Sequence, residues 1–364
     1  MNNPGTPLAM SATDESAAAD RGTRWRVAAA VAAFTGVLAI IRYVHDPALS
    51  SDLDHLWFAS RVMLQGGNPY DAVGPGKAFE WPWPVLYPLP GLLLVAPLTV
   101  LPVALARVVM SVASGAALGF AMGSRWRVQW PLLVSASYFL ATMRNQWSPL
   151  ILAAFWLPWL ALIVIVKPNV GILPLLTQSR RLLFRTVLAA VVLLLLSVVI
   201  RPTWPREWLA LASVAPNKEV PLFQPFGVLL LATLPLLTTA EGRVLLGASL
   251  IPQTPSVYDT LPLFALCRTT REALILATLS HVLQWLVIAR GPYASYEASY
   301  ASLAQLNVLT ILLPAMLMLL ERRFQLASRA GVALSPAAWR GIELTLTAAC
   351  VFSLLLQLKL LLLW

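Results

Sequence analysis

The 364-residue chain has little charge and almost no cysteine or histidine. Asp, Glu, Lys and Arg make up only 12% of its residues, about half of what a soluble domain carries. Hydrophobic residues make up 59%, and the mean hydropathy is +0.74. This composition excludes a soluble globular protein and predicts an all-α, polytopic membrane protein. At about 20 residues per span, the length fits one bundle of about eight to eleven helical segments.

Cys267 and Cys350 both lie in apolar stretches, and the histidines at 45, 55 and 281 are widely separated. The two cysteines exclude a disulfide framework, and the spacing of these residues matches no known metal-ligand pattern. We therefore predict no metal and no cofactor. The net charge of +10 comes from short basic clusters between apolar runs. Such clusters set membrane topology, and with no basic stripe or motif we predict no nucleic-acid partner.

Residues 1–20 are small, polar and acidic, which predicts a disordered cytoplasmic tail. Arg21, Arg24 and Arg26 precede an apolar run at 27–45 that is too long for a signal peptide and lacks a cleavage site. This run is predicted to be an uncleaved first span, with the N-terminus in the cytoplasm. Residues 21–364 are predicted to form a single transmembrane domain.

Residues 46–85 form the longest interruption between hydrophobic segments, and we predict that they form the first outer loop. The loop contains five of the sixteen acidic residues, together with Trp57, Trp81 and Trp83. Its segment 53–64 alternates apolar and polar residues as a helix lying on the membrane surface does. An acidic, aromatic outer loop is the first functional candidate.

Several later segments are predicted to be short or broken by proline. If Arg144 and Lys167 both lie outside, the stretch between them must enter the membrane and return, or one of the two must lie at another depth. Broken helices occur in a membrane only where protein or a water-filled cavity satisfies the freed backbone groups. We therefore expect a cavity that opens outward. Full spans are expected near 103–123, 186–200, 222–238, 272–289, 303–320 and 341–362, and a proline-rich interfacial or re-entrant piece at 86–102. Residues 130–143 are expected to return outward, and broken segments are expected at 148–166 and 244–266.

Five motifs, in order along residues 25–265, resemble those of the family-87 membrane glycosyltransferases of the GT-C superfamily. The first is the segment DLDHLWFASRVMLQGGNPYD, with an Asp after the first span, then aromatics, Gly66 and Pro69-Tyr70. The other four are Leu86-Tyr87-Pro88-Leu89-Pro90, Arg144-Asn145-Gln146, Lys167-Pro168 and Pro255-Ser256-Val257-Tyr258-Asp259.

The chain also departs from the family pattern. Asn145 stands where the family has Gly in its Gly-Gln turn, and the second proline of the Tyr-Pro-Pro motif is displaced to Pro90. The region between Gln146 and Lys167 is shorter by about one helix pair. Two interpretations remain open: a compact active member, or a relative that has lost activity.

The resemblance implies a GT-C fold and an enzyme that takes a sugar, mannose by family analogy, from a polyprenyl-phosphate carrier. The sugar is placed with inversion on a hydroxyl of a glycolipid or glycan at the outer face of the plasma membrane. This reaction needs a carboxylate that accepts the hydroxyl proton, and Asp52 is the predicted catalytic base. Asp52 needs water or hydrogen-bond donors to stay ionised, since deep burial would raise its pKa and weaken this assignment.

The leaving phosphate needs cations, and Lys167 and Arg144 are the predicted phosphate ligands because each interrupts an apolar stretch. The alternative for both is a charge that snorkels to the interface. The three tryptophans are better explained as interfacial anchors than as sugar platforms. The remaining predicted contacts each have a structural alternative, such as a helix cap, a hydrogen bond or a solvated face; they are Asp54, His55, Arg61, Tyr87, Gln146, Tyr258 and Asp259.

Two other functions fit parts of the pattern. A transporter or flippase of lipid-linked substrates also has broken helices around a polar cavity, but it should show an inverted repeat, and the 46–85 loop has no counterpart in the second half. A catalytically silent relative that acts as an assembly subunit is the other alternative.

Overall fold

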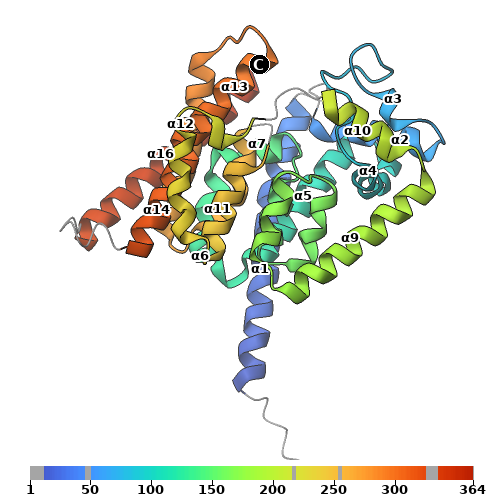
Figure 1. The fold of residues 1–364 in the computed structure, drawn as a ribbon. Coiled ribbons are helices and arrows are strands. Elements are labelled where there is room, and N and C mark those ends of the chain that lie inside the picture. Colours follow the sequence, from blue (N-terminus) through green and yellow to red (C-terminus); the bar gives the residue numbers. More distant parts are fainter. Residues whose placement is uncertain (1–11, 46–50, 215–218, 253–255, 325–334, 364) are drawn as a thin grey trace, which may run out of the picture.

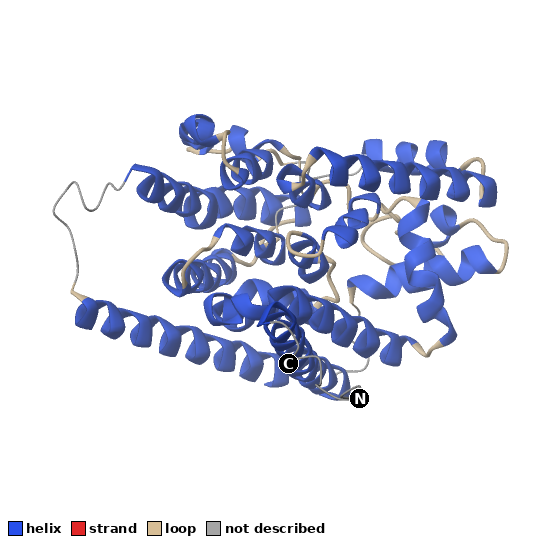
Figure 2. Ribbon diagram, turned by 90° about the horizontal axis from the view of Figure 1, so that it is seen from below, coloured by secondary structure: helices blue, strands red, loops and turns tan. Residues whose placement is uncertain are grey.

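The computed structural model describes residues 12–45, 51–214, 219–252, 256–324 and 335–363. Within these ranges every named element is a helix, and Val73 and Phe79 form an isolated β-bridge. Figures 1 and 2 show a bundle of helices, and in Figure 1 the start of the first helix, α1 (Ala12–His45), projects from one end. The all-α, multi-pass prediction is confirmed. In the described part of the chain, six helical segments are long and apolar enough to cross a membrane: Asp20–His45, Val103–Val134, Arg180–Ile200, Thr270–Arg290, Ala298–Phe324 and Ala337–Leu360.

The first third of the chain contains the first two long spans and the loop between them. Residues 12–20 were predicted to be disordered but are helical, in keeping with the helix propensity of their alanine-rich sequence; residues 1–11 lie outside the described part. A helix is present at 52–64, where a surface helix was predicted. The elements are α1 (Ala12–His45), α2 (Asp52–Leu64), α3 (Pro69–Ala72), α4 (Leu89–Val95), η1 (Ala96–Val100) and α5 (Val103–Met122).

The middle of the chain is a series of short helices, as its prolines predicted. The stretch between Arg144 and Lys167 folds as α8 followed by a 3-10 helix that begins at Pro158, so it enters the bundle and returns. The elements are η2 (Gly123–Arg125), α6 (Trp126–Gln129), η3 (Trp130–Val134), α7 (Ala136–Met143), α8 (Ser148–Ala154), η4 (Pro158–Ile165) and η5 (Val170–Thr177).

The remainder differs from the prediction in two places. The expected span at 222–238 is only the ten-residue 3-10 helix η7 with Pro235 inside it, and the expected loop after residue 200 contains the helix α10. The elements are α9 (Arg180–Ile200), α10 (Trp204–Val214), η6 (Pro221–Phe223), η7 (Gly227–Leu236), α11 (Ala240–Leu250), η8 (Val257–Leu266), α12 (Thr270–Arg290), α13 (Tyr296–Asn307), η9 (Val308–Leu312), α14 (Leu313–Phe324) and α16 (Pro336–Leu363).

Helices α1 and α5 form the most extensive contact in the bundle. Gly115 and Gly119 allow this close approach. A Cβ on Gly119 would lie 2.7 Å from the carbonyl oxygen of Val27, and one on Gly115 would lie 2.4 Å from Oγ1 of Thr35. Small residues four apart let membrane helices pack backbone to backbone.

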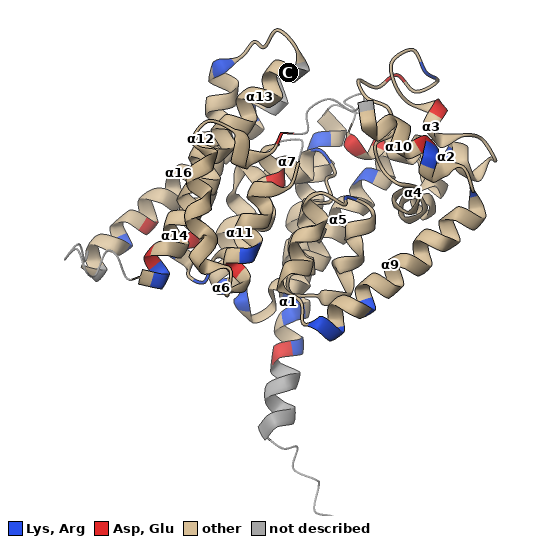
Figure 3. Cartoon of the chain, in the orientation of Figure 1, with Lys and Arg blue, Asp and Glu red and all other residues tan. Residues whose placement is uncertain are grey.

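The two ends of the bundle carry different polar groups. At one end Arg24 packs on Gly123, and an ion-pair network joins Arg322 to Glu272 at 2.7 Å and Arg268 to Glu241. Figure 3 shows Lys and Arg at the corresponding ends of α1, α9, α11 and α14. The C-terminus of α1 and the N-terminus of α5 lie at the opposite end, where the candidate site is found.

Candidate active site

The start of α2 is fixed by a capping box. The hydroxyl of the N-cap Ser51 accepts from the backbone N–H of Leu53, and the Asp54 carboxylate accepts from the Ser51 N–H at 2.7 Å. Asp54 also accepts from Nε of Arg107 on α5 at 2.7 Å, and both side chains are buried. This ion pair holds α2 against α5 and places Asp52, the first residue of α2, at the end of the bundle.

Asp52 lies where three distant segments meet. Its backbone N–H donates to the carbonyl of Arg144 at 3.1 Å. Its Oδ2 accepts from the side-chain amide of Gln146 and lies 3.5 Å from the hydroxyl of Tyr258. The side chain is half-buried. The predicted base therefore has two hydrogen-bond donors and some contact with solvent.

Lys167 lies in the same cluster. Its Nζ is 2.6 Å from Oδ1 of Asp259 and 5.4 Å from the centre of the Tyr258 ring. The Lys167 side chain is 14% exposed and that of Asp259 only 3%. An ammonium group has three donors, so Lys167 retains donors for a further anion while it neutralises Asp259.

Burial raises the pKa of Asp52 above its usual range, and the charge of Asp259 acts in the same direction. The charges of Arg144 and Lys167 and the Gln146 hydrogen bond lower the pKa and limit this rise. The rise caused by burial is the effect that was expected to weaken the assignment of Asp52 as the base, whereas the half-exposed position, the two cations and the Gln146 donor favour the ionised form that a base requires.

The other predicted residues lie at different distances from Asp52. Tyr87 is close, since the charges of Asp52 and Asp259 add to the burial that raises its pKa. His55 is buried with its ring centre 6.0 Å from that of Tyr87, and it stacks on Trp81 at 5.0 Å. The side chain of Arg61 is exposed on α2, 5.3 Å from the ring centre of Trp57, and does not join the cluster.

The side chain of Arg144 is exposed at the C-terminus of α7 and forms no ion pair among the described residues. The carboxylate of Asp54 accepts hydrogen bonds from Arg107 and Ser51. Asp54 therefore caps α2 and pairs with Arg107. Trp57 donates to the carbonyl of Leu98 at 3.1 Å.

Sequence reasoning missed the polar groups behind the site. Arg107, buried at the start of α5, pairs with Asp54 and lies 4.8 Å from the Tyr43 ring centre. Asn145 has φ +51°, a left-handed conformation that glycine adopts freely and asparagine tolerates. The turn at Asn145 is therefore one that glycine could also form. Arg107 could have been found from the sequence, because a charged residue inside an apolar span usually has a buried partner.

In the described part of the chain, no three His, Cys, Asp or Glu side chains are grouped closely enough to hold a metal ion. The prediction of no metal and no cofactor stays a prediction. Comparisons of the chain with protein-family models, curated proteins and solved structures found no match.

Proposed function

We propose that the protein is an inverting membrane glycosyltransferase that moves a sugar, mannose by family resemblance, from a polyprenyl-phosphate carrier to a hydroxyl of a glycolipid or glycan. The main support is the position of Asp52, which accepts from Gln146 and Tyr258 next to the cations of Lys167 and Arg144. A base and cations at one end of a membrane bundle are the groups that this reaction requires.

In the proposed reaction the acceptor oxygen attacks the anomeric carbon on the face opposite the phosphate. The bond from that carbon to the phosphate oxygen breaks, and its electron pair leaves with the polyprenyl phosphate. Asp52 takes the proton of the acceptor hydroxyl. Lys167 and Arg144 stabilise the phosphate as its charge increases.

The basic end of the bundle is assigned to the cytoplasm, since Arg and Lys concentrate in cytoplasmic turns. The site would then lie at the outer face of the plasma membrane, where lipid-linked sugars are used. Asn145 in place of the Gly of the Gly-Gln motif is compatible with this proposal, because Asn145 adopts a left-handed conformation that glycine also adopts freely.

The test uses purified protein in liposomes with polyprenyl-phosphate-[¹⁴C]mannose and a membrane glycolipid extract as acceptor. We expect label in the glycolipid fraction and released polyprenyl phosphate. Turnover with GDP-mannose or a UDP-sugar in the absence of polyprenol would overturn the lipid-linked donor. Movement of labelled carrier across the bilayer without transfer would instead identify a flippase, and no turnover of any kind would identify a silent subunit.

A further inference from the structure

Asn145 occupies a tight turn between two residues that bind Asp52. It follows Arg144 at the end of α7, its side chain is buried, and its φ of +51° lies in the left-handed region. This conformation is strained for most residues with a side chain. Glycine would supply the turn at lower cost, so the asparagine side chain must be explained by its contacts.

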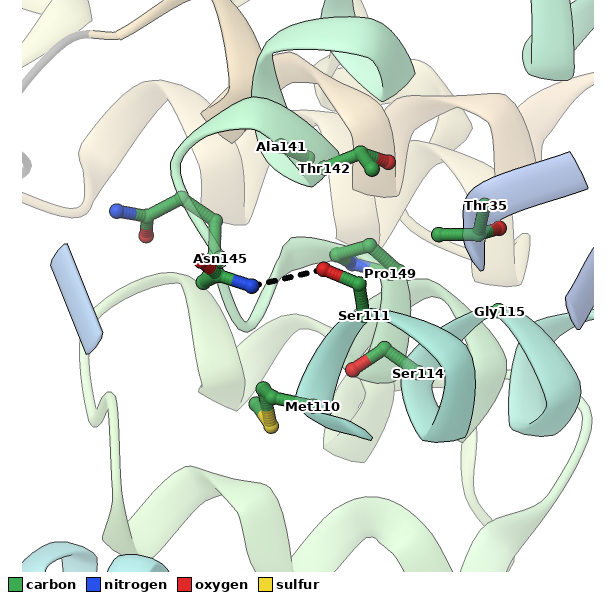
Figure 4. Close-up of a pocket in the computed structure, with 10 residues that line it drawn as sticks. Thr35, Met110, Ser111, Ser114, Gly115, Ala141, Thr142, Asn145 and Pro149 are labelled. Atoms are coloured by element: carbon green, nitrogen blue, oxygen red, sulfur yellow. Dashed lines mark hydrogen bonds between the residues drawn. The ribbon is translucent and has the colours of Figure 1, made fainter. Parts of the chain in front are cut away.

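The Asn145 amide joins the turn to two long helices. Its Oδ1 accepts from the hydroxyl of Tyr43 on α1. Its Nδ2 donates to the carbonyl of Arg107 at 2.8 Å and to Oγ of Ser111 at 2.7 Å, both on α5. Figure 4 shows Asn145 directed at Ser111. Both residues line a cavity of only about 10 Å³. The turn is therefore anchored to α1 and α5 with little space to move.

The neighbours of Asn145 bind Asp52 from the same turn. The Arg144 carbonyl accepts the Asp52 backbone N–H, and the Gln146 amide donates to Oδ2 of Asp52. Arg107, whose carbonyl accepts from Asn145, also pairs with Asp54 two residues beyond Asp52. These contacts connect the turn to α2 in two ways: directly, through Arg144 and Gln146 to Asp52, and through Arg107 of α5 to Asp54. The Asn145 amide makes the contacts of the turn with α5 and with Tyr43 of α1.

We infer that Asn145 is a positioning residue that holds Gln146 against the Asp52 carboxylate. Its effect on sugar transfer rests on the proposed function, whereas its effect on Asp52 does not. Without the amide, the turn keeps its shape but loses its anchors, and Gln146 no longer has a fixed position.

The consequence for Asp52 has a defined sign. The charged or titratable groups that face it are Arg144, Lys167, Asp259, Tyr258 and Tyr87. Arg144 belongs to the same turn as Asn145, and movement of its cation away from Asp52 would raise the Asp52 pKa further; the other four lie on other segments. Loss of the Gln146 donor removes a bond to the ionised carboxylate and so raises the Asp52 pKa. The acid limb of the rate profile should then move to higher pH, since the base must be ionised to work.

The test compares Asn145→Gly with Phe226→Gly. Phe226 is the other described non-glycine residue with positive φ; its side chain is 58% exposed, and it precedes η7, which packs on α11 and α14. Two readouts are measured in each variant: the pH profile of kcat for transfer, and the infrared titration of the Asp52 carboxyl, obtained by subtraction of the Asp52→Asn spectrum. Tyr43→Phe, which removes one donor to Asn145, serves as a milder variant if Asn145→Gly does not fold.

We expect Asn145→Gly to lower kcat by about ten- to a hundredfold, the effect of losing a hydrogen bond to a charged group, and to shift both titrations to higher pH. Tyr43→Phe should shift them less in the same direction, and Phe226→Gly should match the wild type. If the wild type transfers sugar, and Asn145→Gly has the same kcat and the same Asp52 titration as the wild type, the positioning role is wrong. If the infrared titration shifts but no form transfers sugar, the positioning role stands and the proposed function fails.

Discussion

The ammonium of Lys167 lies 2.6 Å from the carboxylate of Asp259, across 92 residues of sequence. The pair joins Lys167, which follows the 3-10 helix η4, to Asp259 in the 3-10 helix η8. Tyr258, next to Asp259, has its hydroxyl 3.5 Å from Oδ2 of Asp52. Lys167, Gln146 and Asp259 thus lie in short 3-10 helices or next to the ends of short helices, and the breaks in these segments bring their side chains into one site.

Asp52→Asn should abolish sugar transfer while the protein inserts and folds normally. An amide cannot take the acceptor proton, so we expect kcat to fall by at least about a hundredfold. Asp71→Asn, which changes an exposed carboxylate of the same loop, is the matched control. Transfer at the wild-type rate by Asp52→Asn would eliminate Asp52 as the base.

Asp54→Ala should destabilise the protein, although Asp54 is only two residues from Asp52. It removes the carboxylate from buried Arg107, and breaking a buried pair on one side costs about 3–5 kcal/mol. Thermal unfolding in detergent should show a lower midpoint than for Asp71→Ala. The folded fraction of Asp54→Ala should transfer sugar faster than Asp52→Asn does. If both variants lose transfer activity equally, Asp54 takes part in the reaction.

Lys167→Met should impair both stability and transfer, because it leaves the buried Asp259 carboxylate without its partner. The double variant Lys167→Met/Asp259→Asn removes that buried charge and should recover much of the stability. Its transfer rate should stay low if Lys167 binds the donor phosphate. Recovery of both properties would show that Lys167 acts only as a structural partner.

His55 should make the fold sensitive to acid. Burial lowers its pKa to about 4, an effect opposed by the nearby Asp54 charge, whereas the unfolded value is about 6.5. Between these values the unfolded chain binds a proton that the folded chain does not, so stability falls as the pH falls, by at most about 3 kcal/mol. His55→Phe should lose less stability than the wild type between about pH 7.5 and about pH 4.5. Exposed His45→Gln is the control, and identical pH dependence in His55→Phe would contradict the assignment.

Gly119→Ala should separate α1 from α5. The added Cβ would lie 2.7 Å from a carbonyl oxygen and 2.8 Å from a Cα of α1, and overpacking against backbone costs about 1–3 kcal/mol. Gly341→Ala is the matched control, since open space surrounds Gly341. The unfolding midpoint should fall only for Gly119→Ala, and an unchanged midpoint would show that the two helices can shift apart freely.

The sequence by itself determined the features that depend on local composition. Apolar runs predicted the long spans, the alternation at 53–64 predicted α2, and prolines predicted the break at Pro158. The same local rules failed at 222–238, where apolar composition indicated a span but η7 is only ten residues long with a proline inside it. They also failed at residues 204–214, where α10 replaces an expected loop.

Only the tertiary structure decided which polar groups meet. Sequence patterns drew attention to Asp52, Gln146, Lys167 and Asp259 separately, but their pairing depends on how α2, α7, η4 and η8 pack. Arg107 and the anchors of Asn145 lie on helices that are distant in sequence, so no local pattern joins them. A buried charge or amide must find its partner wherever packing brings one within hydrogen-bonding distance, and that choice is made by the whole bundle.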